Sequence, residues 1–434
     1  MSPPLRIAII GYGSGGQAAA LMLSRDGHAV SVFERAPAPG PVGAGFLLQP
    51  VGLAVLWELG LLDEVRRYGA PVARLYGETR RGRAVMDMRY AELDAGLCGM
   101  GLQRGALFEL LDAAWRDRRR LHAGREIVSL DAEAGTFVDA QGEAHGGYDL
   151  VVVADGAASK LRAQVVPARL NQPYPWGAWW CLVDAGGWEF ADQLQQRYVD
   201  ARKMAGLLPV GGRPGDPARK LSFFWSAPCA ALDAGIADAE AWRAEVAALW
   251  PEAAERLRDV AVPGELKVAR YRDVVHRQWC RGRTLLLGDA AHAMSPQLGQ
   301  GVNMALLDAR ALASALRTAR AAGADLRRDR DRAATLATYA RERRRHVGIY
   351  HLWSRWLTPL FQSEHDRVAW CRDRLFHPLS RLPGSRGQAL RVLTGTRRGW
   401  FGTMSVPRGL IEALAQPLDL AAHAPQRIGA DQHG

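Results

Sequence analysis

The residues best suited to hold a ligand lie in one stretch, RGRTLLLGDAAHAMSPQLGQGVNMALLDAR, at residues 281–310. An apolar strand ends there at Gly288 and Asp289, and a glycine-rich turn with Gly299 and Gly301 opens directly into a helix. A carboxylate at a strand end suits a sugar-like hydroxyl, and the amides and dipole of a helix N-terminus stabilise negative charge. The stretch therefore predicts a site for an anionic, polyhydroxylated ligand.

The beginning of the chain predicts a second part of the same site. Residues 5–10, LRIAII, form an apolar, β-branched run typical of a buried parallel strand. Three glycines follow as a GxGxxG turn, namely Gly11, Gly13 and Gly16. A helix and a second strand come next, and the strand at 29–33 ends at Glu34, where the ribose-binding acid of a dinucleotide site is expected. Glycine-rich turns also serve only to reverse a chain, but this complete order favours dinucleotide binding.

A third segment, YDLVVVADGAASKLR at residues 148–162, is a predicted strand that ends at Asp155 and Gly156. The three segments together resemble the fingerprints of the FAD-dependent aromatic hydroxylases, the p-hydroxybenzoate hydroxylase-like class A flavoprotein monooxygenases. The resemblance includes residues 42–61 and a following Gln103-Arg104 pair. An NAD dehydrogenase has no reason to carry the second and third fingerprints.

The resemblance implies where FAD binds. The GxGxxG glycines are placed under the pyrophosphate and Glu34 at the adenosine ribose, while Arg104 reaches the pyrophosphate or ribityl region and Asp289 the ribityl hydroxyls. The turn at 299–303 is placed along the pyrimidine edge of the isoalloxazine, with Pro296 close to its reactive face. The cofactor-binding residues expected in this way are Gly11, Gly13, Ser14, Gly15, Gly16, Glu34, Arg35, Ala44, Gly45, Arg104, Ile127, Asp155, Asp289, Pro296, Gly299, Gly301, Val302 and Asn303.

Several of these residues have an alternative interpretation. Asp155 belongs to a motif associated with both FAD and NAD(P)H, and a structural role is as well supported as ligand contact. Arg104 opens an apolar helix and, taken alone, is a solvated first-turn residue. The family commonly has Asn where this chain has Val51, which weakens any side-chain contact there. His292 follows a strand end, where histidine more often packs or hydrogen-bonds locally, so we assign it no catalytic role.

The order of the predicted elements indicates an α/β fold with two lobes. The chain has 434 residues, 48% hydrophobic content and 46 glycines, enough for more than one core. The expected parts are a discontinuous, doubly wound FAD-binding lobe of Rossmann-like, glutathione-reductase type at 1–70, 100–165 and 266–325, an inserted antiparallel-sheet substrate lobe at 71–99 and 166–265, and a C-terminal helical segment at 326–434. We expect residues 266–275 to return the chain to the nucleotide lobe, and Pro251 to break a helix over 240–257.

The inserted sheet is expected to lie over the flavin. Its predicted strands include WGAWWCLV, RKMAGLLPVG and KLSFFW, all within residues 176–225. Phe224 and Trp225 are candidate substrate-facing residues, together with Gln49 and Pro296. The alternative is that these aromatic side chains belong to a core, which is at least as common on a sheet.

Basic charge concentrates near the C-terminus. Residues 341–410 contain fourteen arginines and four acidic residues, which gives a charge of +10 in a chain whose total is +11. Large apolar residues accompany them, including Trp353, Trp356 and Trp370. Such a composition suits either a helix on an anionic membrane surface or a helical cap that packs on the two lobes, and we favour the cap slightly. Nucleic-acid binding is the poorer explanation, because no recognition fold accompanies the charge.

The remaining composition predicts a cytoplasmic enzyme. The five cysteines are scattered without a CxxC pair or zinc-like spacing, so we expect no metal site and no disulfide framework. The first predicted strand begins at Leu5, which leaves no room for a signal peptide. No apolar run approaches the ~18 residues that span a bilayer. Cytoplasmic localisation, with membrane-surface association as a possibility, follows from these features.

The family pattern also implies the chemistry. NADH or NADPH, between which the sequence does not choose, reduces FAD, and O2 adds to give a C4a-hydroperoxide that hydroxylates an electron-rich, aromatic or apolar substrate. No side chain is assigned a catalytic role, because the flavin carries the chemistry.

Three other functions share the fingerprints: a halogenase, a reductase of prenyl or lipid substrates, and a non-catalytic FAD-fold escort for lipidated partners. The halogenase WxWxIP motif is absent, since Trp176, Trp179 and Trp180 have the wrong spacing. The reductase and the escort remain as alternatives.

Overall fold

The structure, a computed structural model, describes the chain except residues 1–2, 41–42, 44, 383 and 419–434. Its first sheet has six strands in the order β18-β19-β12-β1-β2-β8. These strands are β1 (Arg6–Ile10), β2 (Ala29–Glu34), β8 (Leu121–Ala123), β12 (Leu150–Val153), β18 (Cys280–Arg281) and β19 (Thr284–Leu286). All pairs are parallel except β18 with β19. The central strands are apolar throughout because helices cover both faces of a parallel sheet.

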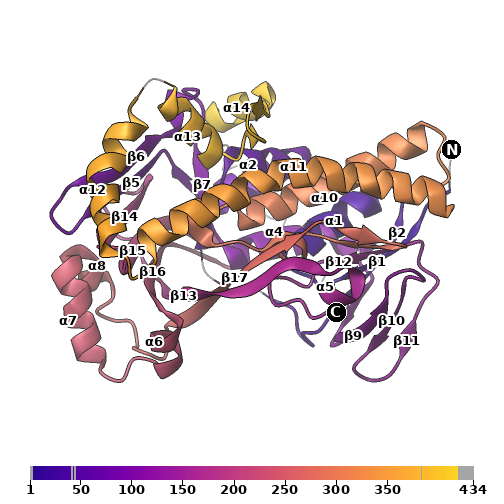
Figure 1. The fold of residues 1–434 in the computed structure, drawn as a ribbon, viewed down its shortest axis with the longest axis horizontal. Helices are drawn as coiled ribbons and strands as arrows, with labels where there is room; N and C mark the ends of the chain where they lie inside the picture. The colour runs from indigo at the N-terminus through magenta and orange to yellow at the C-terminus, as the bar shows by residue number, and fades with distance from the viewer. Residues whose placement is uncertain (1–2, 41–42, 44, 383, 419–434) are drawn as a thin grey trace, which may run out of the picture.

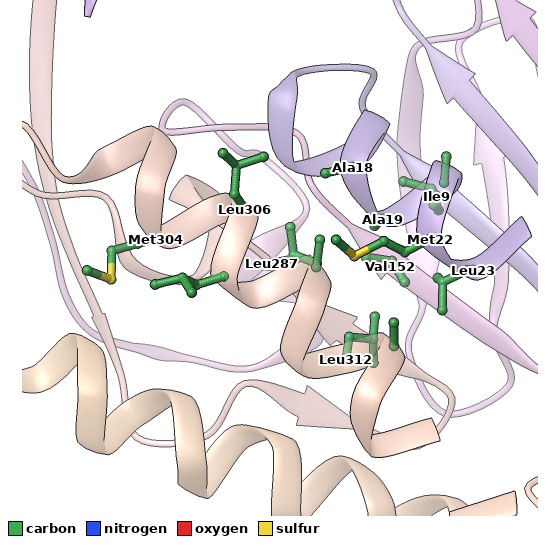
Figure 2. Packing of buried hydrophobic residues seen from close by; sticks show 14 of the residues in the cluster. Ile9, Ala18, Ala19, Met22, Leu23, Val152, Leu287, Met304, Leu306 and Leu312 are labelled. Atoms are coloured by element: carbon green, nitrogen blue, oxygen red, sulfur yellow. The ribbon is translucent and has the colours of Figure 1, made fainter. Parts of the chain in front are cut away.

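Close helix packing holds this lobe together. Helix α1 (Ser14–Arg25) lies against α10 (Gly301–Ala321) on one side and α4 (Arg104–Trp115) on the other. Small side chains such as Ala18 and Ala19 let α1 approach the sheet, and Met22 and Leu23 fill the space beside Leu312 (Figure 2). The largest buried core of the protein is therefore the FAD-type lobe predicted from the two glycine turns.

The second sheet has seven strands in the order β17-β13-β16-β15-β14-β5-β6. Its strands are β5 (Arg74–Thr79), β6 (Ala84–Arg89), β13 (Ala168–Asp184), β14 (Gln193–Val199), β15 (Lys203–Arg213), β16 (Asp216–Pro228) and β17 (Lys267–His276). All neighbours are antiparallel except β14 with β5. One sheet is thus assembled from two separate insertions, as the sequence predicts.

The outer face of this sheet is covered by three short helices, at the lower left of Figure 1. They are α6 (Cys229–Ala234), α7 (Ala239–Leu249) and α8 (Pro251–Arg256). The predicted break at Pro251 is confirmed, because Trp250 leaves helical geometry and proline starts the next helix.

One predicted element belongs to the other lobe. Residues 266–275 were expected to re-enter the nucleotide lobe, but β17 pairs with β13 along the edge of the seven-stranded sheet. Most of its first residues are exposed or half-buried, as an edge strand permits. The chain rejoins the six-stranded sheet only at β18 (Figure 1).

Two small sheets were not predicted. Strands β9 (Ile127–Asp131), β10 (Thr136–Asp139) and β11 (Ala144–His145) form an antiparallel meander at the lower right of Figure 1. Strands β3 (Gly45–Leu48), β7 (Gly99–Gln103) and β4 (Ala70–Val72) form the other sheet. It lies where the lobes meet, since a Cβ on Gly101 would stand 1.8 Å from the Pro209 carbonyl oxygen of β15.

Short helices connect these sheets. They are α2 (Pro50–Glu58), α3 (Leu62–Tyr68), α5 (Arg162–Val165) and α9 (Asp289–His292), with single 3-10 turns η1 (Tyr90–Glu92), η2 (Arg116–Arg118) and η3 (Pro296–Leu298).

The C-terminal segment is helical, as predicted, apart from a short hairpin. It contains α11 (Asp329–Phe361), α12 (Asp366–Ser380), α13 (Ser385–Leu393), the hairpin of β20 (Arg397–Arg398) and β21 (Gly402–Thr403), and α14 (Arg408–Ala415). Helix α11 runs beside α10 across the top of the molecule, and α12 and α13 continue to the upper left (Figure 1). Among the described residues, no helix has the length and apolar character needed to cross a membrane.

Trp225 is a correction to the sequence-based prediction. Its side chain is 3% exposed and faces the outer helices, where its ring lies 6.1 Å from that of Trp242. Phe224, the next residue along β16, therefore points to the opposite, inner face. Because adjacent strand residues alternate, only one of the two can face the other lobe, and Trp225 belongs to the core beneath α7.

We expect Trp225→Ala to lower the free energy of unfolding by about 3–5 kcal/mol, since it removes a buried aromatic side chain from a packed core. Urea unfolding monitored by circular dichroism measures this loss. The control is Val128→Ala at an exposed position, for which we expect a change within about 0.5 kcal/mol. A loss below about 1 kcal/mol for Trp225→Ala would contradict the core assignment.

Candidate cofactor and substrate site

The GxGxxG turn has the backbone geometry of a phosphate-binding turn. Gly11 has φ +106°, and a Cβ there would stand 2.5 Å from the Ala154 carbonyl oxygen. A Cβ on Gly16 would stand 2.1 Å from the Gly11 carbonyl oxygen, so glycine is needed for α1 to approach β1. A Cβ on Gly13 would meet nothing within 4 Å, which leaves open space at the N-terminus of α1. These three positions match the three glycine roles of a dinucleotide site, and they fit FAD.

Glu34 lies at the end of β2, next to this turn. Its carboxylate accepts the backbone N–H of Tyr12 at 2.8 Å and that of Ala36 at 2.9 Å. Each oxygen keeps a further lone pair, so the carboxylate is oriented and still able to accept a ribose hydroxyl. The meander approaches at this point, because the Arg125 N–H donates to the Glu34 carbonyl oxygen at 2.8 Å. Ile127 thus starts β9 near Glu34, although its side chain is buried in the core.

Arg104, the first residue of α4, is exposed. No salt bridge joins it to a carboxylate within the described part of the chain. Contacts between α1 and α4 bring it towards the glycine turn, since the rings of Tyr12 and Phe108 lie 5.6 Å apart and the Gln17 amide donates to the Phe108 carbonyl oxygen at 3.2 Å. A guanidinium at this place, with no carboxylate partner among the described residues, is suited to a pyrophosphate.

The remaining residues expected at this end are placed less specifically. Ser14 and Gly15 open α1, and Arg35 is exposed after β2. Gly45 is enclosed by the other lobe, because a Cβ there would stand 2.3 Å from Val210. Ala44 lies outside the described residues.

An arginine that the sequence did not single out is hydrogen-bonded to the segment that contains Asp155 and Gly156. Arg162 is almost fully buried and donates to the Gly156 carbonyl oxygen at 2.9 Å. Burial raises the pKa of Asp155, although its hydrogen bond with Ser159 and the Arg162 charge oppose the shift. One Asp155 carboxylate oxygen is buried without a hydrogen-bond partner among the described residues. Ligand contact by Asp155 therefore stays a prediction.

Asp289 and the glycine turn come together as the sequence predicts. Gly288 (φ +62°) and Gly299 (φ +60°) adopt left-handed conformations, and Gly301 begins the 21-residue helix α10. A Cβ on Gly301 would stand 3.8 Å from an Asp289 carboxylate oxygen. The carboxylate thus lies at the N-terminus of α10, where Val302 is the second residue of the helix, and the exposed Pro296 starts η3.

Asn303 and Gln49 have side chains that are already engaged. Asn303 is fully buried, accepts the Gln49 backbone N–H at 2.9 Å and donates to the Leu47 carbonyl oxygen at 3.2 Å. Gln49 is also fully buried and accepts the Tyr90 hydroxyl at 2.7 Å. The Gln49 amide nitrogen is buried without a hydrogen-bond partner among the described residues, and its contact with substrate stays a prediction. Asn303 fastens the β3–α2 connection to the turn, so only its backbone is available to a cofactor.

A buried charge cluster behind the turn was missed. Asp308 has no exposed surface. Its carboxylate accepts hydrogen bonds from the Gly288 N–H at 2.8 Å and from Arg343 Nε at 2.6 Å, and it lies 2.6 Å from His292 Nε2. Burial alone would raise the pKa of Asp308, but the His292 and Arg343 charges and hydrogen bonds outweigh it and lower the pKa to about 2. His292 also lies against the Trp279 ring, which agrees with the local role expected for it.

The inner face of the seven-stranded sheet carries partly exposed apolar side chains. Trp180, Leu182 and Phe224 lie on this face, and each keeps some accessible surface. Trp180 and Leu182 were not predicted as site residues, because the alternation of WGAWWCLV places Trp179 and Trp180 on opposite faces without showing which face is the inner one. A Cβ on Gly45 of β3 would stand 2.8 Å from Ser222 of the same face, so this face adjoins the FAD-type lobe.

Three residues elsewhere have the spacing of a metal site. Ligand atoms of Asp139, Glu143 and His145 lie within 4.8 Å of one another. Arg125 bonds both carboxylates, at 2.7 Å and 2.6 Å, so its charge offsets one of their two negative charges.

Comparisons with known proteins agree with the fold and the glycine turns. Residues 5–349 match the family model described as FAD binding domain. The chain is 27% identical over 397 residues to the aurachin C monooxygenase/isomerase of Stigmatella aurantiaca, covering 88% of this chain and 96% of that protein. It is 31% identical to the 2-heptyl-3-hydroxy-4(1H)-quinolone synthase of Pseudomonas aeruginosa UCBPP-PA14, covering 71% of this chain and 80% of that protein. The structure of Klebsiella pneumoniae HpxO complexed with FAD and uric acid superposes with a TM-score of 0.72 at 24% identity, covering 90% and 96% of the two chains.

The fold and the three motifs define a flavin-dependent oxidoreductase. The chain belongs to the FAD binding domain family, among the FAD-dependent aromatic hydroxylases, and FAD is its cofactor. The individual residues that contact FAD are proposed from the geometry described above.

We expect Asp289→Ala to weaken FAD binding about 10- to 100-fold, because charge-assisted hydrogen bonds contribute about 1.5–3 kcal/mol. Quenching of flavin fluorescence during reconstitution of the FAD-free protein measures the dissociation constant. Asp63→Ala, at an exposed carboxylate on α3, is the control. Full FAD occupancy and an unchanged dissociation constant in Asp289→Ala would show that this carboxylate does not bind the cofactor.

Proposed function

We propose that this protein is an NAD(P)H- and O2-dependent monooxygenase that hydroxylates a neutral, apolar aromatic substrate. When bound, FAD accepts a hydride from NADH or NADPH and activates O2 for transfer of one oxygen atom. The glycine turn and Glu34 would hold its adenosine end, and Asp289 with the 299–303 turn would hold its ring end. Its fit to this chain rests on the glycine positions and on the carboxylate at the α10 N-terminus.

The substrate class is supported by the inner face of the large sheet. Uncharged side chains of this face include those of Trp180, Leu182, Leu208, Val210, Ser222 and Phe224, and Val210 and Ser222 lie against Gly45 of β3. A substrate carboxylate placed against them would be desolvated without a partner, which is costly. Aromatic and alkyl surface is stabilised by the same side chains. The quinolone named in the Pseudomonas aeruginosa relative, with its heptyl chain, is a compound of this kind.

Other parts of the chain would support the reaction without taking part in bond making. The N-terminus of α10 directs its free N–H groups and dipole towards the turn, where they stabilise negative charge. Apolar side chains around the turn, such as the buried Leu298 and the half-buried Met294, exclude water.

The test is incubation of the FAD-loaded protein with NADH or NADPH and a panel of neutral phenols, indoles and alkylquinolones, with carboxylated analogues as the comparison. We expect a neutral compound to accelerate NAD(P)H oxidation and to gain the mass of one oxygen atom.

Phe224→Ala should raise KM about 10-fold because an aromatic contact contributes ~1 kcal/mol or more. Trp225→Phe, on the opposite face of β16, should leave KM unchanged.

The outcomes separate the alternatives. Turnover of carboxylated compounds alone would overturn the substrate class. Reduction of prenylated lipids without O2 consumption would indicate the reductase, and a purified protein that does not bind FAD would indicate the lipid escort. Incorporation of halide in place of oxygen would indicate the halogenase.

We also propose that helix α12 contacts an anionic membrane surface. Its buried residues are Ala369 and Arg372, whereas Trp370, Leu375 and Leu379 each expose more than half of their surface. Arg372 has no exposed side-chain surface and donates to the Leu360 carbonyl oxygen at 2.7 Å. A helix that buries arginine and exposes tryptophan and leucine has the reverse of the usual soluble arrangement.

The charges around this face favour anionic lipid over a neutral partner. Arg367 and Arg374 are exposed on the same helix and Arg381 directly after it, and the Arg374 guanidinium lies 4.0 Å from the centre of the Trp370 ring. Each basic residue near a lipid headgroup contributes about 1 kcal/mol, and apolar side chains insert at the interface. The helix also caps the protein, since its inner side packs on β6, so the cap and the membrane contact are compatible.

We expect the full-length protein to sediment with vesicles of phosphatidylglycerol and phosphatidylcholine, and to be released as salt screens the arginines. The double variant Leu375→Ser/Leu379→Ser should bind at least about tenfold more weakly, because it removes apolar surface that inserts at the interface. The control is Val128→Ser/Val268→Ser, at exposed positions away from α12. Equal binding by both double variants, or no binding by the wild type, would contradict this contact.

A further inference from the structure

The end of helix α13, in the C-terminal segment, lies against the 299–303 turn. Helix α13 ends at Leu393, and the buried side chain of Gln300, in the middle of the turn, meets that end. The Gln300 amide donates to the Leu393 carbonyl oxygen at 2.7 Å and lies 3.4 Å from that of Val392. The last carbonyls of a helix have no partner within the helix, so Gln300 supplies the C-terminal cap of α13.

The residues after α13 are held against the same place from two sides. Gly395 has φ +79°, and a Cβ there would stand 2.3 Å from Val51 and 3.2 Å from the Gln300 side-chain oxygen. Its carbonyl oxygen lies 2.9 Å from His346 Nε2. His346 in turn contacts Arg343 at 2.6 Å, and Arg343 bonds Asp308.

Both ends of the ligand-binding stretch are therefore joined to one C-terminal peptide. Gln300 makes the direct contact. Gly288 reaches the same peptide through Asp308, Arg343 and His346. Two routes of buried polar contacts leave little freedom for one part to move alone, because a broken contact leaves buried polar groups unpaired.

Thermodynamic linkage makes this arrangement reciprocal. If the cofactor stabilises the turn in the conformation that the α13 cap requires, it stabilises the cap by the same free energy, and the cap strengthens cofactor binding equally. The region involved, 385–396, lies beyond residue 349, where the match to the FAD binding domain model ends.

We propose that Gln300 is a positioning residue that couples FAD binding at the 299–303 turn to the order of the C-terminal segment 385–396. The inference rests on the proposed placement of FAD at this turn, and it does not depend on which substrate is hydroxylated. In this proposal, bound FAD stabilises the conformation of the 299–303 turn. Gln300 of the turn then caps the C-terminus of α13 and keeps residues 385–396 ordered.

The test is hydrogen exchange, measured by mass spectrometry, on the full-length protein with and without FAD. We expect removal of FAD to increase exchange in peptides covering 385–396, and to leave peptides from α7 and α8 on the far side of the sheet unchanged. No change at 385–396, or an equal increase in both regions, would overturn the proposal.

A variant isolates the contact. In FAD-loaded Gln300→Leu we expect faster exchange at 385–396 and a FAD dissociation constant raised about tenfold. The visible absorption spectrum of the bound flavin should shift, because the turn no longer holds its position beside the ring. Gln388→Leu, the same substitution at an exposed position of α13, is the control and should match the wild type in all three measurements.

These measurements separate the two proposals. Wild-type exchange, FAD affinity and spectrum in Gln300→Leu would exclude the coupling even if the enzyme hydroxylates its substrate. If Gln300→Leu does not fold, the comparison of wild-type protein with and without FAD still decides. A protein that shows the coupling but hydroxylates nothing on the panel would exclude the proposed reaction alone.

Discussion

A carboxylate with no exposed surface, Asp308, lies where the flavin-side stretch meets the C-terminal helices. A buried charge is stable only when it is paired and hydrogen-bonded, and its partners here come from three elements. The Gly288 N–H belongs to the strand end, His292 to α9 and Arg343 to α11. Because Asp308 is paired with Arg343 of α11 and with the Gly288 N–H, this helix lies against the loop that carries Asp289. Arg343 also contacts His346, whose ring lies 2.9 Å from the Gly395 carbonyl oxygen after α13.

The second requirement is close backbone approach between the lobes. Gly45 and Gly101 lie on the small sheet that contacts β15 and β16, and side chains at either position would collide with the other lobe. This contact turns the face of the large sheet that carries Ser222 and Phe224 towards the FAD-type lobe and leaves Trp225 on the outer face. The same sheet therefore supplies a core on one side, beneath α7, and carries the proposed substrate-facing side chains on the other.

The C-terminal segment contacts the FAD-type lobe at one place and exposes apolar side chains at another. Its long helix α11 packs along α10 and supplies Arg343 to the buried cluster. Beyond it, α12 buries Arg372 and exposes apolar side chains to solvent. Because α13 follows α12 and ends against Gln300, the proposed membrane surface is joined to the 299–303 turn through one short helix.

Local sequence was sufficient for everything that depends on near neighbours. The glycine turn at Gly11, the acid at Glu34 and the helix start at Gly301 each need only a strand, a turn and a helix in order, and these were predicted correctly. Residues 266–275 were misplaced because a strand's pattern shows that it is half-buried without showing which sheet it joins. The enclosure of Gln49, the outward direction of Trp225 and the pairing of Asp308 with Arg343 were decided by tertiary structure. Each depends on a partner far away in the chain, and periodicity within one element carries no record of that partner.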